Sequence, residues 1–524
     1  MEHYPPELRS APCPVAALLR LPALHSELAA GLSAHHVHCI CIADDAASAD
    51  YPPEANEHKP LDVYPTLVAQ GILKRNWMEK RCKQVPSVLV VLFEWEEEDN
   101  WKAVESSVGN RIDRVKHNSR HRGTRILCVR VHRKRGRIDE REEKERMSSF
   151  RRRADLESNN VTNLVVDSMA SATTKLAQAI RDLSKNYYRD EGRRLKNVKS
   201  RLSKATQPAL YIRVHFKIAF HDEMRASFLD AVKNYTEAYR HLREMYKIFT
   251  GVFAMEAKTI AEFLNYKLCA TLLRLKRRGE AIAQFKQHLR MYKGDVAPLE
   301  VEFEHWSWVS RQYRVFGELL EALPGAAAGG GDRWQWPGLY YHAAAKFSAR
   351  RRDAAQSRCS LVEADEAALR PAWGEYFGQF AIRQLTGSDD ELFTALTVAE
   401  KVVHHGDAVV EMLGKAYEQF KRRKQVRMIH FLVSDMAQEY YRQAQFDKAK
   451  KLFDTVSTNY RDEKWWSVLA TTLRRTLDCS KRLALGHAFV ECVFAPAIDL
   501  SLISQADPCL WPGRQFADHT HKQL

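Results

Sequence analysis

Side chains that could bind a metal gather at one place in this 524-residue sequence. Zinc requires about four ligands that converge on one point. Because side chains on a strand alternate between two faces, no more than about three neighbouring ligands can converge there. We therefore predict that these His and Cys residues decorate a strand, and that the protein holds no metal and no cofactor. The candidate ligands are His35, His36, His38, Cys39 and Cys41.

Catalytic motifs are equally scarce. The acidic run EWEEED, residues 94–99, follows an apolar segment and has the composition of a solvated loop. No HExxH or GxSxG motif occurs, and neither GxGxxG nor GxxxxGK[ST] follows a predicted strand. The sequence thus predicts a protein that is not an enzyme.

Composition limits the cellular setting. Hydrophobic residues make up 45% of the chain, yet no window approaches the length of a membrane span. The N-terminus shows no secretory signal, and the ten cysteines form no CxxC pair or disulfide spacing, so we expect a cytoplasmic protein. A net charge of +15 favours acidic partners in general, whether nucleic acid, anionic membrane or protein.

One segment, residues 130–153, concentrates this charge. It mixes many bases with acids, and we predict a charged surface loop that contacts an acidic protein face or a membrane. RNA binding would require aromatic side chains for stacking, and Phe150 is the one aromatic residue in the segment. Nucleic acid is therefore the less favoured partner. The candidate contact residues are Arg133, Lys134, Arg135, Arg137, Arg151, Arg152 and Arg153.

The elements that carry these residues fall into two classes. Short β-branched runs at 37–43, 85–93, 125–131 and 161–166 read as buried strands, and helical stretches lie between them. This alternation predicts an α/β head with a parallel or mixed sheet. From about residue 170 the pattern becomes helix after helix, so the fold class is α-rich overall.

Small and aromatic residues recur in the helical part. Ala437 lies twelve residues before Ala449, and Phe453 follows one helical turn later. The same offsets separate Ala219 from Ala231 and Cys269 from Ala281. Antiparallel helices that cross closely need a small residue on each side, so we predict helical hairpins in an irregular solenoid of tetratricopeptide-repeat type. A helical bundle, which uses the same small and aromatic spacing, is the alternative. In the best-matched hairpin the structural residues are Ala437, Tyr440, Phe446, Ala449, Phe453, Trp465 and Trp466.

Several long stretches resemble the foie gras family of trafficking protein particle (TRAPP) complex subunit 11. They are GILKRNWMEKRCKQVPSVLVVLFEWEEEDNWK at 71–102, VHFKIAFHDEMRASFLDAVKNYTEAY at 214–239, FLNYKLC at 263–269, and EYYRQAQFDKAKKLFDTVSTNYRDEKWW up to residue 466. The resemblance covers about 65–482 and divides the chain into four parts. These are a divergent segment 1–60, the head 61–170, a solenoid 171–485 with a flexible loop at 325–332, and an unmatched tail 486–524 that we expect to be disordered.

The resemblance implies a non-enzymatic scaffold in vesicle transport between the endoplasmic reticulum and the Golgi, with a link to autophagy. Its partners would be the other TRAPP subunits and, indirectly, the Rab-type GTPase that the complex activates. Family members continue past residue 524 into a β-rich part, so we expect a truncated or alternative form. Two other hypotheses are a nucleic-acid-binding helical-repeat protein, favoured by the charge alone, and an enzyme built on the head.

Overall fold

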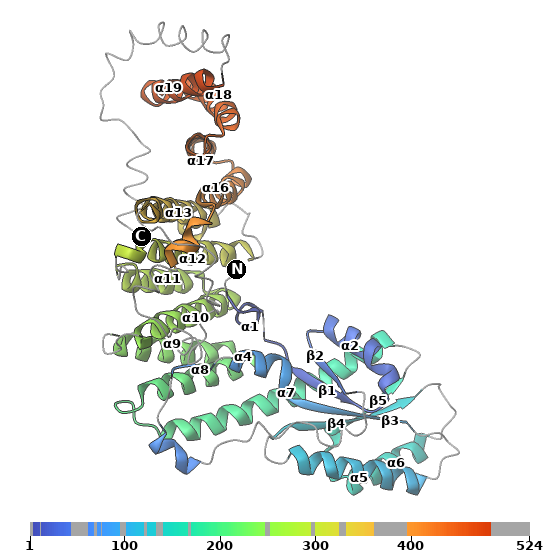
Figure 1. Cartoon of the computed structure of the whole chain (residues 1–524). Helices are drawn as coiled ribbons and strands as arrows, with labels where there is room; N and C mark the ends of the chain where they lie inside the picture. Colours follow the sequence, from blue (N-terminus) through green and yellow to red (C-terminus); the bar gives the residue numbers. More distant parts are fainter. Residues whose placement is uncertain are drawn as a thin grey trace. The chain divides into compact units, whose positions relative to one another are not determined.

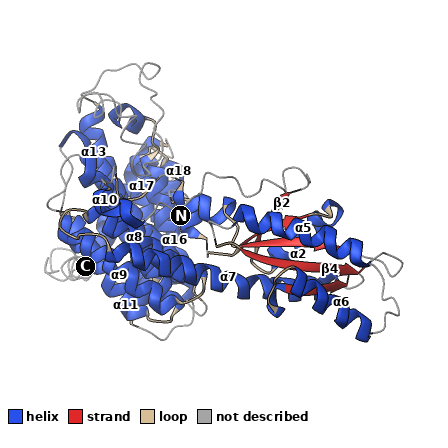
Figure 2. Ribbon diagram, turned by 90° about the horizontal axis from the view of Figure 1, so that it is seen from below, coloured by secondary structure: helices blue, strands red, loops and turns tan. Residues whose placement is uncertain are grey.

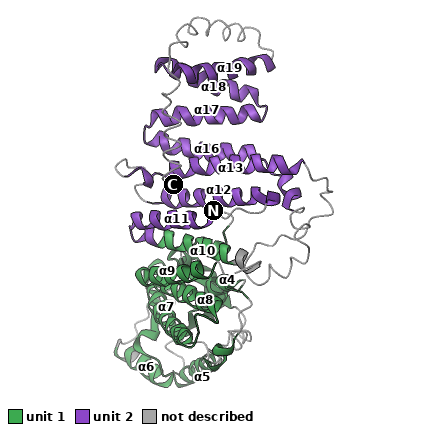
Figure 3. Ribbon diagram, turned by 90° about the vertical axis from the view of Figure 1, so that its left-hand side faces the viewer, with its two compact units in different colours: residues 1–271, 375–384 green, residues 272–374, 385–524 purple. Residues whose placement is uncertain are grey.

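The structure is a computed structural model of the whole chain. It describes residues 4–10, 12–42, 61–67, 71–74, 76–94, 101–119, 123–132, 140–165, 169–246, 252–294, 299–323, 332–360 and 396–483. Among these residues the chain divides into two compact units, 4–271 and 272–483 (Figure 3).

Five short strands form one parallel sheet in the first unit (Figure 1). Their spatial order is β2-β1-β3-β4-β5, and every neighbouring pair is parallel. Because the strand order reverses between β1 and β3, the sheet is doubly wound. The strands are β1 Val15–Leu19, β2 His38–Ile42, β3 Val88–Phe93, β4 Arg125–His132 and β5 Val161–Val165.

Helices cover both faces of this sheet (Figure 2). Alternate residues of β3 separate cleanly, since Val90 faces a core shared with α2 (His25–Ala34) and α7 (Met169–Ser200), whereas Val91 faces α5 (Trp101–Ser119) and α6 (Glu140–Arg153). On the first face α2 and α7 approach so closely that a side chain at Gly31 would not fit. A Cβ added there would lie 2.6 Å from Cγ2 of Thr173. The predicted α/β head is confirmed.

The sheet extends beyond the predicted head at both ends. Strand β1 lies between β2 and β3, so residues assigned to a divergent segment 1–60 supply an interior strand and one edge strand of the sheet. Its sequence VAALL consists of residues that favour helices as much as strands, and tertiary pairing decided the outcome. At the other end, α7 was expected to open the solenoid, but Leu176 and Ile180 pack on the sheet.

The charged segment 130–153 is largely not a loop, which corrects the prediction. Residues up to His132 complete β4, and residues 140–153 form α6. Phe150 on this helix is 1% exposed, and its ring centroid lies 5.1 Å from that of Phe93. The helix was missed because a few apolar residues at helical spacing are hidden among many charges.

Helices complete the first unit beyond the sheet. Trp77 packs its ring on Phe216 and Phe220, and Tyr4 packs on Phe263 and Tyr266, so the N-terminal segment is anchored on the helices. These helices are α1 Pro6–Arg9, α4 Trp77–Glu79 with the π-helical turn Lys80–Gln84, α8 Pro208–Met224, α9 Phe228–Met245, and α10 Val252–Arg274 up to residue 271; the short 3₁₀ turns are Pro22–Leu24, Leu61–Thr66 and Ser158–Asn160.

The second unit is a succession of antiparallel helices. From α12 to α19 each helix contacts the next along the chain (Figure 3). The ring of Phe285 on α11 stacks on that of Phe316 on α12, with the ring centroids 4.2 Å apart. Contacts between successive neighbours are typical of a solenoid, and the predicted solenoid is confirmed. The helices are α11 Arg278–Tyr292, α12 Glu302–Glu321, α13 Pro337–Cys359, α16 His405–Arg422, α17 Val426–Arg442, α18 Phe446–Asp462 and α19 Trp466–Arg482, with 3₁₀ turns at Leu299–Val301 and Arg333–Gln335.

The last three hairpin turns share one conformation. At each turn one residue has a positive φ angle: 52° at Lys424, 58° at Ala444 and 59° at Lys464. At each turn the next residue donates its N–H to a carbonyl five residues back, as Gln445 does to Tyr440 at 2.9 Å, and the left-handed residue bonds a carbonyl three back. This pair of bonds is the Schellman motif, which satisfies carbonyls left free at a helix end.

Candidate functional site

The predicted structural hairpin lies on α17 and α18. Ala437 and Ala449 are both 0% exposed and share a cluster with Phe453 and with Cys479 of α19. Tyr440 and Phe446 are partly buried against the same cluster. Small side chains therefore let these two helices cross, and large ones fill the space beside the crossing.

The two adjacent tryptophans begin the final described helix. Trp465 precedes the first residue of α19, and its ring stacks on Tyr460 of α18 with the centroids 5.7 Å apart. Trp466 packs against the cluster that contains Val456 and Leu469. Both rings thus fix α19 against α18, which makes them packing residues.

A polar groove lies beside this hairpin in the second unit. Its volume is about 740 Å³, and it is bordered by the C-terminal part of α13, the start of α16 and the end of α17. Charged, amide and imidazole side chains line it: Arg352, Asp353, Gln356, His404, His405, Asp407, Glu439, Arg442, Gln443 and Gln445. Such a surface suits a polar peptide segment better than an apolar ligand.

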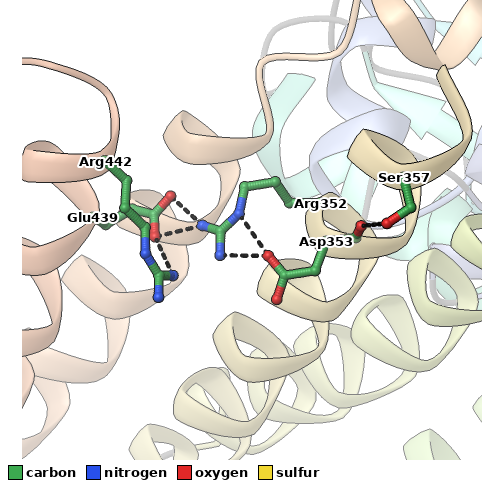
Figure 4. Close-up of polar contacts among 5 residues, drawn as sticks. All are labelled: Arg352, Asp353, Ser357, Glu439 and Arg442. Atoms are coloured by element: carbon green, nitrogen blue, oxygen red, sulfur yellow. Dashed lines mark hydrogen bonds and ion pairs between the residues drawn. The ribbon is translucent and has the colours of Figure 1, made fainter. Parts of the chain in front are cut away.

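A buried ion pair lies among the residues that line the groove, and Figure 4 shows its contacts. Arg352 of α13 is 6% exposed and donates to both carboxylate oxygens of Glu439 on α17, which is 3% exposed. The same guanidinium donates to Asp353 at 2.9 Å and 3.1 Å. Burial opposes the charge on Arg352, but the hydrogen bonds with Glu439 and Asp353 outweigh it and raise the pKa of the guanidinium.

A second ion pair lies close to the first along the chain. Arg351 donates to the two oxygens of Glu400, each at 2.6 Å, and His405 lies 3.6 Å from the same carboxylate. Burial lowers the pKa of His405, so its imidazole is neutral at pH 7. Because these acids and bases are engaged with one another, they hold helices together and supply no free acid–base pair. Sequence patterns gave no signal for either pair, since the partners are remote along the chain.

The predicted His and Cys cluster does not converge. His38 and Cys41 on β2 are exposed, His35 caps the end of α2, and His36 adopts a positive φ of 57°. Within the described ranges, no group of three or more His, Cys, Asp or Glu side chains is arranged to hold a metal ion. Of the acidic run 94–99, the structure describes Glu94 alone.

Cysteine chemistry has little support in this part of the chain. Burial raises the pKa of Cys39, Cys82 and Cys128 to about 12 in each case, so these thiols stay protonated at neutral pH.

No described helix is both long and apolar enough to span a membrane.

The basic candidate residues are only partly described. Arg133, Lys134, Arg135 and Arg137 lie outside the described residues. Arg151, Arg152 and Arg153 form the last turn of α6, where Arg153 donates to Asp113 and Asn110 of α5. Arg152 is exposed and available to a partner.

Two family models match the sequence. One is described as the trafficking protein particle complex subunit 11 N-terminal domain and matches residues 57–173. The other is described as foie gras liver health family 1 and matches residues 254–495, which include all described helices of the second unit.

Curated relatives that match most of this chain agree with these models. Trafficking protein particle complex subunit 11 from Homo sapiens, from Bos taurus and from Gallus gallus is in each case 32% identical over 442 residues, or 80% of this chain. The sequence therefore resembles subunit 11 over most of its length. It spans 38% of the length of these relatives.

The foie gras match extends a little further toward the C-terminus than the resemblance read from the sequence. It runs to residue 495, so it enters the tail 486–524 that the sequence analysis left unmatched. Among solved structures, a signal-transduction ATPase with a tetratricopeptide repeat sensor from Pyrococcus horikoshii covers 95% of this chain and 91% of its own. Its sequence identity is 11% and its TM-score 0.15, which are too low to indicate a shared fold.

Proposed function

We propose that this chain is a non-enzymatic scaffold subunit of a TRAPP-type tethering complex in vesicle transport between the endoplasmic reticulum and the Golgi. The observation that carries the proposal is the relationship to subunit 11 over 80% of the chain. Solenoids offer long surfaces to protein partners, and the foie gras match includes the described helices of the second unit. The described side chains add no catalytic set.

The partners in this proposal are the other TRAPP subunits, which would bind along the helices of the second unit. A Rab-type GTPase would be engaged indirectly, through the complex. The chain would therefore act in the cytoplasm at the surface of Golgi and intermediate membranes. A lesser part of the proposal is that the basic residues at 133–137 and 151–153 contact an acidic partner or a membrane.

A tagged pull-down tests this role. The whole chain is expressed in cells, the lysate is treated with nuclease, and bound proteins are identified by mass spectrometry. Recovery of TRAPP subunits is the expected result. Their absence, together with partners that vanish on nuclease treatment, would favour the nucleic-acid-binding hypothesis that the +15 charge suggests.

The hairpin offers a structural variant for the same assay. Ala449→Trp places a large ring where Ala437 and Phe453 leave no space, and overpacking should cost about 1–3 kcal/mol. We expect lower helicity and loss of partner binding. Lys451→Trp, at an exposed position on the same helix, is the control and should keep both. A soluble Ala449→Trp chain with unchanged helicity and binding would remove the hairpin from the proposal.

A further inference from the structure

The strongest unassigned feature is a long basic stretch in the first unit. Residues 192–221 contain eight Lys and Arg residues and no Asp or Glu. They form the last part of α7, the turn that follows, and most of α8 (Figure 1). Two of the eight are structural, because Arg194 pairs with Glu191 and Arg213 donates to the carbonyls of Gly71 and Ile72.

Four others reach solvent around the end of α7. Lys196, Arg201 and Lys204 are exposed and Lys199 is half-buried. Among the described residues, none of these four cations forms an ion pair with a carboxylate. The Lys204 ammonium lies 5.2 Å from the ring centre of Tyr211, which leaves its charge unneutralised.

Apolar side chains lie beside these charges. The 3₁₀ turn Leu61–Thr66 is held at the end of α7, because Gln207 donates to the carbonyl oxygens of Tyr64 at 2.8 Å and Leu67 at 2.9 Å. Tyr64 also packs on Leu195 and Val198 of α7. Leu61 and Val63 of this turn are 37% and 40% exposed, so two aliphatic side chains are accessible to solvent next to the basic end of α7.

The acids near this surface are few. Asp62 is exposed between Leu61 and Val63. On the neighbouring α8 and α9, Asp222 and Asp230 are both bound by Arg225 at 2.9 Å. The net charge of the surface is therefore positive. We call the set Leu61, Val63, Lys196, Lys199, Arg201 and Lys204 the basic–apolar surface.

We propose that the basic–apolar surface docks on an anionic lipid bilayer. Lys and Arg attract phosphate and carboxylate headgroups, and aliphatic side chains between them enter the boundary with the acyl chains. A nucleic acid would use the charges but would gain little from exposed aliphatic residues, because it is bound through aromatic stacking. This inference extends the proposed role in vesicle transport.

Vesicle sedimentation with the whole chain tests the proposal without any partner subunit, so the two proposals can fail separately. Vesicles of phosphatidylcholine alone are compared with vesicles that also contain phosphatidylserine. Wild type should bind the anionic vesicles and lose binding as salt rises. Replacing Lys196, Lys199, Arg201 and Lys204 by Gln should reduce partitioning at least about tenfold, since each base near an anionic surface contributes severalfold.

A control removes equal charge elsewhere. Lys421, Lys424, Lys448 and Lys451 are exposed in the second unit, and their replacement by Gln should change partitioning less than about twofold. The pair Arg151→Gln and Arg152→Gln separates the end of α6 from the basic–apolar surface. Leu61→Gln with Val63→Gln should weaken the part of binding that persists at high salt.

Several results would overturn the proposal. One is unchanged vesicle binding by the four-residue variant when its circular dichroism melt matches wild type. Another is an equal loss of vesicle binding when the four lysines of the second unit are replaced, which would mean that the net charge of the chain alone drives binding. If the four-residue variant does not fold, Lys196→Gln with Arg201→Gln replaces it and should still lose severalfold. Binding of an oligonucleotide but of neither vesicle would assign the surface to nucleic acid.

Discussion

At the residue scale, the described interior pairs its charges closely. In the first unit, Lys267 is 1% exposed and its ammonium lies 3.2 Å from Glu223, which also accepts a hydrogen bond from Tyr235 at 2.8 Å. In the second unit Arg352 and Glu439 play the same part. Such pairs add little net stability but make the loss of one partner costly.

The Arg352–Glu439 pair yields a direct prediction. Glu439→Gln leaves the buried guanidinium without its principal counter-charge, so stability should fall by about 3–5 kcal/mol. Differential scanning calorimetry measures this as a lower transition temperature for the second unit. The comparison is Arg442→Gln, whose side chain is 52% exposed at 3.6 Å from Glu439 and should change stability by no more than about 0.5 kcal/mol.

Buried His221 predicts how stability depends on pH. Its side chain is 1% exposed between the rings of Trp77 and Tyr188, and burial, with Arg81 nearby, lowers its pKa to about 3. Between pH 6.5 and 3 the unfolded chain therefore binds a proton that the folded chain does not. Stability should fall as pH drops through this window, by up to about 1.4 kcal/mol per pH unit.

Replacing the imidazole isolates this effect. His221→Phe keeps an aromatic ring in the same packing and cannot take up a proton. Urea unfolding of the variant between pH 7 and pH 5 should show a smaller loss of stability than wild type. An identical pH slope in the two proteins would mean that other groups set it, and His215, whose pKa burial lowers to about 4, is the next candidate.

At the element scale, the hairpin turns carry residues that do not prefer their conformation. Ala444 has a φ of 58°, in the left-handed region where glycine has the advantage. Its turn is otherwise satisfied, because Gln445 and Ala444 both donate backbone hydrogen bonds to the end of α17. The three similar turns explain why successive helices reverse direction without proline or glycine.

Ala444→Gly should therefore stabilise the second unit. Glycine adopts the left-handed conformation without a Cβ penalty, and we expect a gain of about 0.5–1 kcal/mol after its greater unfolded-state entropy is counted. Thermal unfolding followed by circular dichroism measures the shift. Ala416→Gly, in the interior of α16, is the opposite control and should destabilise by about 1 kcal/mol or more. A loss of stability at both positions would contradict the turn assignment.

At the scale of the whole molecule, we expect folding of the first unit to depend on its N-terminal strands, because β1 pairs on both sides. The subunit 11 N-terminal domain match begins at residue 57, after β1 and β2. Every residue of β1 is buried, and the strand pairs with β2 on one side and β3 on the other. A boundary drawn from the family match would remove two of the five strands, the edge strand β2 and the interior strand β1.

Two fragments test this. Residues 1–271 should be soluble and unfold cooperatively, because they hold the sheet, both covering layers and the helices through most of α10. Residues 57–271 should aggregate or melt without a cooperative transition, since β3 loses its partner and an apolar edge is exposed. Both fragments are compared by thermal melting and size-exclusion chromatography. Equal cooperativity in the shorter fragment would show that β1 and β2 are dispensable.

Much of this protein followed from sequence alone. Four strands, the helical second unit and the crossing residues Ala437 and Ala449 were predicted, because hydrophobic period and small-residue spacing are local patterns. The resemblance to subunit 11 was visible too, since its motifs are continuous stretches of chain. Hydrophobic period, small-residue spacing and sequence motifs each extend over no more than a few tens of residues.

Only the tertiary structure decided the rest. Strand β1 owes its conformation to pairing with β2 and β3, and α6 owes its place to Phe150 under a cover of charges. The Arg352–Glu439 pair and the contact of Gln207 with Tyr64 join residues far apart in sequence. No local sequence pattern encodes these long-range contacts, because they depend on how complete helices and strands pack in three dimensions.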